Sequence, residues 1–124
     1  MDLLVQVGLV ELAVAALLGW AMVVREEKPE WLKKIGVVQP RRILQIHLDY
    51  VMMGLISIAV GLAIPDIPDA AAALLIFGTV MNPLLFIPPA FSPDVDKRLW
   101  YRVLSATSFL AMSIALVWAA IIGP

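Results

Sequence analysis

Apolar residues occur in four long runs, and short segments between them hold most of the charged residues. The runs are 22 to 24 residues long: Leu3–Val24, Ile43–Ile64, Ala70–Phe91 and Leu99–Ile122. A helix of that length extends ~33 Å, enough to cross a hydrocarbon core of roughly 30 Å. Helices of a soluble bundle would carry a broad polar face, whereas these runs carry only isolated polar residues. The pattern predicts an all-α fold, an integral membrane four-helix bundle forming a single transmembrane domain over residues 1–124.

Composition supports this class and excludes others. Hydrophobic residues make up 62% of the chain, far above their share in soluble domains. The formal net charge is −1, which gives no electrostatic reason to expect a nucleic acid partner. The chain has no Cys, so disulfides, thiolate metal sites and covalent haem attachment through a Cys-x-x-Cys-His motif are excluded. The first run is too long for a signal-peptide core and has no Lys or Arg before it, so we expect a membrane span.

The nine Lys and Arg residues predict the orientation of the four helices. They lie between the first and second runs and at the turn between the third and fourth: Arg25, Lys28, Lys33, Lys34, Arg41, Arg42, Lys97, Arg98 and Arg102. Neither end of the chain nor the turn at Pro65–Asp69 carries one. Because Lys and Arg concentrate on the cytoplasmic side, we expect both termini outside the cell. The first basic segment is long enough for a short surface helix near Glu30–Ile35, with Trp31 at headgroup level.

The second run holds the only histidine, His47, on a stripe of polar and small residues. At about 100° per residue the stripe covers an arc of roughly 80°. Its members are His47, Tyr50, Gly54, Ser57 and Gly61. Asp49 points roughly 160° away from His47, so the two are not a hydrogen-bonded pair on this helix.

Two interpretations of this stripe are open. Small residues let a neighbouring helix pack closely, and they equally let a flat apolar ligand lie against the backbone with His47 addressing it. An ionisable group inside a membrane favours a functional site, and neutral imidazole is the commonest protein ligand of haem iron.

The third run contains Asn82 directly before Pro83, and this proline predicts a kink because it removes a backbone hydrogen bond. Four of its residues share a face: Gly78, Asn82, Phe86 and Pro89. Since this helix runs inward, Asn82 comes to about the depth of His47. The fourth run adds Ser105 and Ser108 in the same layer. Asn and Ser commonly bond neighbouring helices, yet polar groups gathered at one depth also favour a pocket in the inner leaflet.

Glu11 lies near the middle of the first run, on a face with Gly8, Ala15 and Gly19. We therefore expect it to point at another helix rather than at lipid. Two roles are open for this carboxyl group. It either takes up and releases a proton during function, or it stays protonated and donates a structural hydrogen bond.

Several of these positions together resemble the styrene oxide isomerase and hydroxylaminobenzene mutase superfamily, small bacterial membrane enzymes with four spans. The resemblance is a pattern spread over most of the chain. Gly8 and Gly19 have the family's spacing in the first span. The second and third spans match through His47, Met53, Gly54, Pro65, Asn82 and Phe86.

The resemblance implies a homotrimer in the bacterial inner membrane, with haem b between protomers and His47 as the axial metal ligand. In the styrene oxide isomerase branch, ferric iron acts as a Lewis acid that opens an epoxide. Asn82 takes a catalytic role by position and Tyr50 is a second candidate, while Gly54, Met53 and Phe86 belong to the cofactor site. Three residues depart from that branch, which has Asn, Tyr and Asp where this chain has Met53, Phe86 and Gly78.

We therefore predict an isomerase that rearranges epoxides or hydroxylamines among small lipophilic substrates reached through membrane lipid. Two other classes fit part of the pattern. Small multidrug antiporters also have four spans and a carboxylate in the first, comparable to Glu11. Their aromatic and glycine motifs in the later spans are missing here, and the one-sided basic residues enforce a single orientation. A non-catalytic membrane subunit would need only the helix-packing residues.

Overall fold

The computed structural model describes residues 2–124, and the regular structure in that range is entirely helical. Four segments are long and apolar enough to cross a membrane. They are α1 (Asp2–Glu27), α3 (Arg41–Ala63), α4 (Asp69–Leu84) continued by α5 (Ile87–Phe91), and α6 (Leu99–Ile122). The four predicted spans are thus confirmed as helices, with ends that agree to within about three residues.

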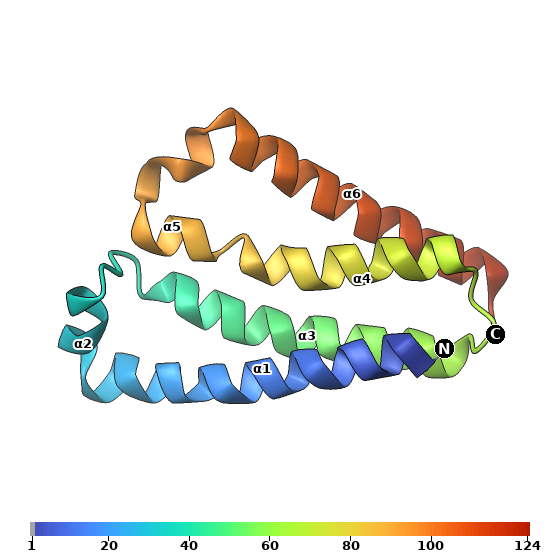
Figure 1. The fold of residues 1–124 in the computed structure, drawn as a ribbon, viewed down its shortest axis with the longest axis horizontal. Helices are drawn as coiled ribbons and strands as arrows, with labels where there is room; N and C mark the ends of the chain where they lie inside the picture. Colours follow the sequence, from blue (N-terminus) through green and yellow to red (C-terminus); the bar gives the residue numbers. More distant parts are fainter. Residues whose placement is uncertain (1) are drawn as a thin grey trace.

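The long helices lie next to one another in chain order, α1 against α3, α3 against α4 and α4 against α6 (Figure 1). Both termini lie at one end of the bundle, and the surface helix α2 (Pro29–Lys34) and α5 lie at the other (Figure 1). The short helix expected near Glu30–Ile35 is confirmed as α2. A 3₁₀ helix, η1 (Pro93–Lys97), connects α5 to α6.

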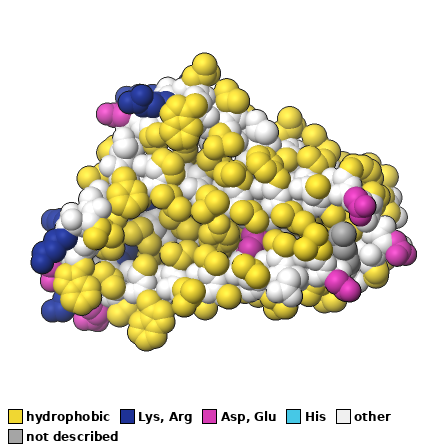
Figure 2. Space-filling view, in the orientation of Figure 1, with side chains coloured by type: hydrophobic (Ala, Val, Ile, Leu, Met, Phe, Trp, Pro, Cys, Tyr) yellow, Lys and Arg dark blue, Asp and Glu magenta, His cyan; other side chains and the backbone are white. Residues whose placement is uncertain are grey.

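The outer surface of the bundle is apolar. Figure 2 shows hydrophobic side chains over the middle of the molecule, with Lys and Arg gathered at the end that holds α2. Large side chains such as Leu17 and Phe109 are 69% and 71% exposed. Such a surface is stable in hydrocarbon and costly in water, so the fold is that of a multi-pass membrane protein.

The closest helix packing joins α1 to α3 at Gly8 and Gly54, which face each other and define the α1/α3 seam. A Cβ atom on Gly8 would lie 2.6 Å from the Gly54 carbonyl oxygen, and one on Gly54 would lie 2.9 Å from the Gly8 carbonyl oxygen. No larger residue fits at either position without moving a backbone. The structure therefore confirms the helix-packing interpretation for Gly54. Ser57 and Gly61, on the same face of α3, are also buried.

The third span breaks where its prolines remove backbone donors. Pro83 lies inside α4, which ends one residue later, and α5 begins at Ile87. The third span is therefore interrupted after Pro83 and not one turn before it, at the carbonyl groups that lack the N–H groups of Pro88 and Pro89. Pro89 has no N–H to donate to the Leu85 carbonyl oxygen, and the Tyr101 hydroxyl of α6 donates to it instead at 2.6 Å. The break thus leaves carbonyl groups that side chains of neighbouring helices satisfy.

Gly8→Ala should destabilise the bundle, because the new methyl group meets a backbone oxygen that moves only if α1 moves away from α3. We expect the free energy of unfolding to fall by ~1–3 kcal/mol, measured by reversible unfolding in detergent micelles. Gly19→Ala on the same helix is the matched control, since the nearest atom to its Cβ would be His47 Cε1 at 3.8 Å, an ordinary contact. Equal stability of the two variants would contradict this account of the α1/α3 seam.

Candidate functional site

His47 faces α1 from about two turns inside α3, and a hydrogen bond fixes its ring. Its Nδ1 lies 2.7 Å from the Ala15 carbonyl oxygen. A carbonyl oxygen only accepts, so Nδ1 carries a proton and donates it. In the neutral ring this leaves the lone pair on Nε2. Metal-ligating histidines commonly have this arrangement, with one nitrogen on the metal and the other N–H on a backbone carbonyl.

His47 is the residue at which the expected haem iron would be held. The ring is half-buried and lies beside two small residues of α1, Ala15 and Gly19, which leave it room. A haem brings four nitrogen ligands of its own, so one protein imidazole is enough to hold the iron. His47 Nε2 is therefore the atom of this chain that would bind it.

A cavity of about 550 Å³ lies between α3, the α4–α5 break and α6. Its wall is mainly apolar with a few polar side chains, the usual character of a small-molecule site. The residues used below to define this α3/α4/α6 cavity are Asp49, Met53, Asn82, Phe86, Tyr101 and Ser105. Near it, α4 and α6 diverge toward α5 (Figure 1).

Asn82 is held in a fixed orientation on the cavity wall. Ser108 Oγ donates to its Oδ1, and its Nδ2 donates to the Met112 sulfur at 3.3 Å. Ser108 is fully buried, so its hydroxyl joins α6 to α4, as expected for an interhelical bond. The amide group of Asn82 has a second N–H, which is the donor it can offer to a ligand.

The expected site residues divide between the two sides of α3. Met53, Asn82 and Phe86 line the α3/α4/α6 cavity together. Tyr50 instead lines a groove on the α1 side, where its hydroxyl donates to the Val80 carbonyl oxygen at 3.1 Å. His47 also faces α1, and the open side of Gly54 is filled by the backbone of α1. Within one protomer, the expected iron ligand and the expected substrate-orienting amide therefore face different helices.

Glu11 is 3% exposed and points at α3, as expected from the sequence. Ser57 Oγ lies 3.2 Å from Glu11 Oε1 and 3.3 Å from Thr79 Oγ1, and the Thr79 hydroxyl donates to the Ile76 carbonyl oxygen. Glu11 Oε2 is buried and has no hydrogen-bond partner among residues 2–124. The Glu11 side chain also lines the α1-side groove, of about 300 Å³, with Tyr50.

Sequence reasoning gave no role to three of these residues. Thr79 completes the hydrogen bonds around Ser57, and Asp49 and Tyr101 line the α3/α4/α6 cavity. The sequence could have placed Asp49 at the cavity, because Asp49 and Met53 are four residues apart and therefore share a helix face.

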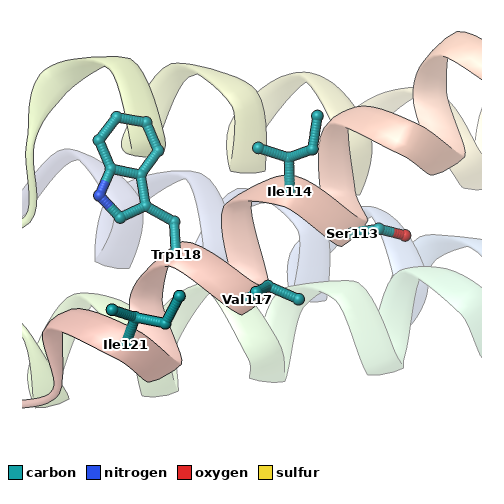
Figure 3. A pocket seen from close by; sticks show the side chains of 5 residues that line it. All are labelled: Ser113, Ile114, Val117, Trp118 and Ile121. Carbon is teal, nitrogen blue, oxygen red and sulfur yellow. The ribbon is translucent and has the colours of Figure 1, made fainter.

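A third hollow, of about 420 Å³, lies on the outside of α6 and is lined by residues of that helix alone (Figure 3). Figure 3 shows Trp118, Ile114, Val117 and Ile121 along it, with Ser113 at one end. The Ser113 hydroxyl donates to the Phe109 carbonyl oxygen of its own helix at 2.8 Å. The hollow is thus an apolar surface feature.

Comparison of the chain with models of protein families, with curated proteins and with solved structures gives no match. Function is therefore inferred from the residues and their geometry.

Ser57→Ala should destabilise the protein, because it removes the hydroxyl that lies between buried oxygens of Glu11 and Thr79. We expect the free energy of unfolding to fall by ~0.5–2 kcal/mol, measured as for the glycine variants. Ser113→Ala is the matched control on α6, where the hydroxyl bonds only a carbonyl of its own helix, and a change within ~0.5 kcal/mol is expected. A neutral Ser57→Ala would show that this contact does not stabilise the fold.

Proposed function

We propose that this protein is a membrane-embedded haem b protein that isomerises small lipophilic molecules, with His47 as the axial ligand. The observation that supports this most directly is the 2.7 Å contact between His47 Nδ1 and the Ala15 carbonyl oxygen. It holds the ring in the tautomer whose Nε2 can ligate, and such a bond also raises the basicity of the ligating nitrogen. The resemblance described above supports the choice of haem.

We further propose a homotrimer in which the site is shared between protomers. In one chain His47 faces α1, whereas Met53, Asn82 and Phe86 line the α3/α4/α6 cavity. A site formed by two copies would unite an imidazole from one with the cavity of the next. This separation within one chain supports a shared site over a site inside each protomer.

When bound, ferric haem supplies a Lewis acid for the oxygen of an epoxide. The chain's own residues supply the surroundings of that reaction. The mainly apolar cavity wall would keep bulk water away from a developing positive charge on carbon and so limit its hydrolysis. Asn82 offers an N–H that orients the substrate oxygen, because Ser108 and Met112 hold its amide in place. Aryl epoxides partition into lipid and reach such a cavity without crossing water.

The departures from the styrene oxide isomerase branch remove polar groups from this region. Met53 and Phe86 line the cavity with apolar side chains. A Cβ on Gly78 would lie 2.7 Å from Met112 Cβ, so an Asp at this position has no room unless α4 and α6 move apart. We therefore expect slow turnover of styrene oxide itself.

We also propose that both termini lie outside the cell, in a bacterial inner membrane. The nine basic residues all belong to the two connections at the α2 end, and the Pro65–Asp69 turn at the other end has none. Reporter fusions at residue 67 and at the carboxyl terminus should both give an external signal. A cytoplasmic signal from either fusion would contradict the proposed orientation.

His47→Ala should abolish the Soret absorbance of protein expressed with ample haem, because no imidazole is left in the chain. It should also abolish the rearrangement of aryl epoxides and aryl hydroxylamines, followed by chromatography of the products. Asn82→Ala is the matched variant in the cavity. It should keep the Soret band and lower turnover by about 10–100-fold, since one oriented donor is lost. Gel filtration and circular dichroism report whether each variant keeps the fold.

Wild-type protein that purifies without haem, or that rearranges neither substrate class, would overturn the proposal.

One observation favours a second function, proton-coupled transport. Glu11 is a carboxyl group buried within α1, with one oxygen unpartnered among the described residues and a groove beside it. If the wild type gives no rearranged product and Glu11→Gln abolishes proton-driven efflux of lipophilic cations from vesicles, transport replaces isomerisation.

A further inference from the structure

Asp49 places a carboxyl group on the wall of the α3/α4/α6 cavity, about two turns inside a membrane-spanning helix. The group is half-buried, and its oxygens are not sealed from the cavity by packing. Among residues 2–124 it has no ion-pair partner and no hydrogen-bond donor. Arg42, two turns earlier on α3, donates to Gln45 Oε1 at 2.9 Å instead. The carboxyl group of Asp49 is therefore free to meet a ligand.

An open carboxyl group at this depth requires a partner. Ionisable residues in spanning helices face cavities and pair with opposite charges, because hydrocarbon solvates neither. The cavity opens between helices whose outer surfaces are apolar, so a partner that arrives through the bilayer must carry apolar groups of its own. A molecule that carries both a cationic centre and apolar groups meets both requirements.

The other residues of the wall favour a cation as well. Phe86, Tyr101 and Phe109 line the same cavity as Asp49. The faces of aromatic rings attract cations, and aromatic rings form the usual sites for quaternary ammonium groups. The rest of the wall consists of four apolar and three uncharged polar side chains: Met53, Leu85, Met112 and Leu116, with Asn82, Ser105 and Ser113. A volume of about 550 Å³ accommodates a small aromatic or alkyl ammonium ion.

We propose that the α3/α4/α6 cavity binds a lipophilic ammonium ion, with its cationic nitrogen beside the Asp49 carboxylate and its apolar part among the aromatic side chains. This goes beyond the proposed isomerase, because a neutral epoxide needs no carboxylate and a cation bound here needs no haem. A bound ammonium ion occupies the space beside Asn82, so it competes with neutral substrates of the same cavity.

Benzyltrimethylammonium tests the proposal, since it has no lone pair with which to ligate iron. Its uncharged isostere neopentylbenzene has the same shape. We would measure binding of the radiolabelled cation to full-length protein in micelles of an uncharged maltoside detergent, with either compound unlabelled as competitor. The wild type should bind the cation, and the isostere should compete at least ~10-fold less well. Wild-type protein prepared without haem should still bind the cation, which separates this site from the haem proposal.

Asp49→Asn keeps the side-chain shape and removes the charge, so it should weaken cation binding about 10–100-fold, and Asp49→Glu should retain part of it. Glu11→Gln is the matched control, a carboxyl group removed from the groove on the α1 side, and should bind as the wild type does. Phe109→Leu changes a side chain that is 71% exposed, so the fold does not depend on it, and should weaken binding about 3–10-fold. Unchanged binding by Asp49→Asn, loss of binding by Glu11→Gln, or equal competition by the isostere would each overturn the proposal.

Discussion

Backbone contact between helices is the constraint on which the rest of this structure depends. Lipid is as apolar as the side chains, so burying Leu or Val between helices gains little over leaving them in the bilayer. What remains is close van der Waals packing and hydrogen bonding. Gly8 and Gly54 let α1 and α3 approach until a Cβ would overlap a carbonyl oxygen, and Gly78 brings α4 equally close to Met112 of α6. Each seam then fixes where the polar residues on its face lie.

The α1/α3 seam and the close packing of α4 on α6 lie on opposite sides of the molecule. The polar side chains of the membrane spans therefore form two separate groups. On the α1 side, His47 reaches the Ala15 carbonyl and Ser57 reaches Glu11. On the α6 side, Asn82 is bonded to Ser108. α3 carries members of both groups on different faces, and Asp49 belongs to the α6 side. Within one chain, His47 and Asn82 therefore face different neighbours of α3.

The long-range features of the fold could be predicted because they depend on runs and on single strong residues. The length of the apolar runs determines the four spans, and the angle of Glu11 determines that it faces a helix. The break in the third span was placed only roughly, because Pro83 predicts it one turn earlier than the interruption between α4 and α5. Which side chains contact each other across neighbouring helices could not be predicted in the same way. Helical periodicity gives the angle between His47 and Asp49, but it does not say which helix packs on each face. The contact of Thr79 with Ser57 and that of Gly78 with Met112 depend on the register between helices, which no local pattern contains.

The close packing of α4 on α6 and the position of Asp49 together determine the character of the α3/α4/α6 cavity. At Gly78 the two helices are so close that a Cβ would lie 2.7 Å from Met112 Cβ, so no side chain lies between them there. Toward α5 the same helices diverge, and the wall of the space between them carries a carboxyl group from α3, together with Met53 (Figure 1). A larger residue at 78 would move α4 and α6 apart, and the cavity that Asp49 lines would widen with them.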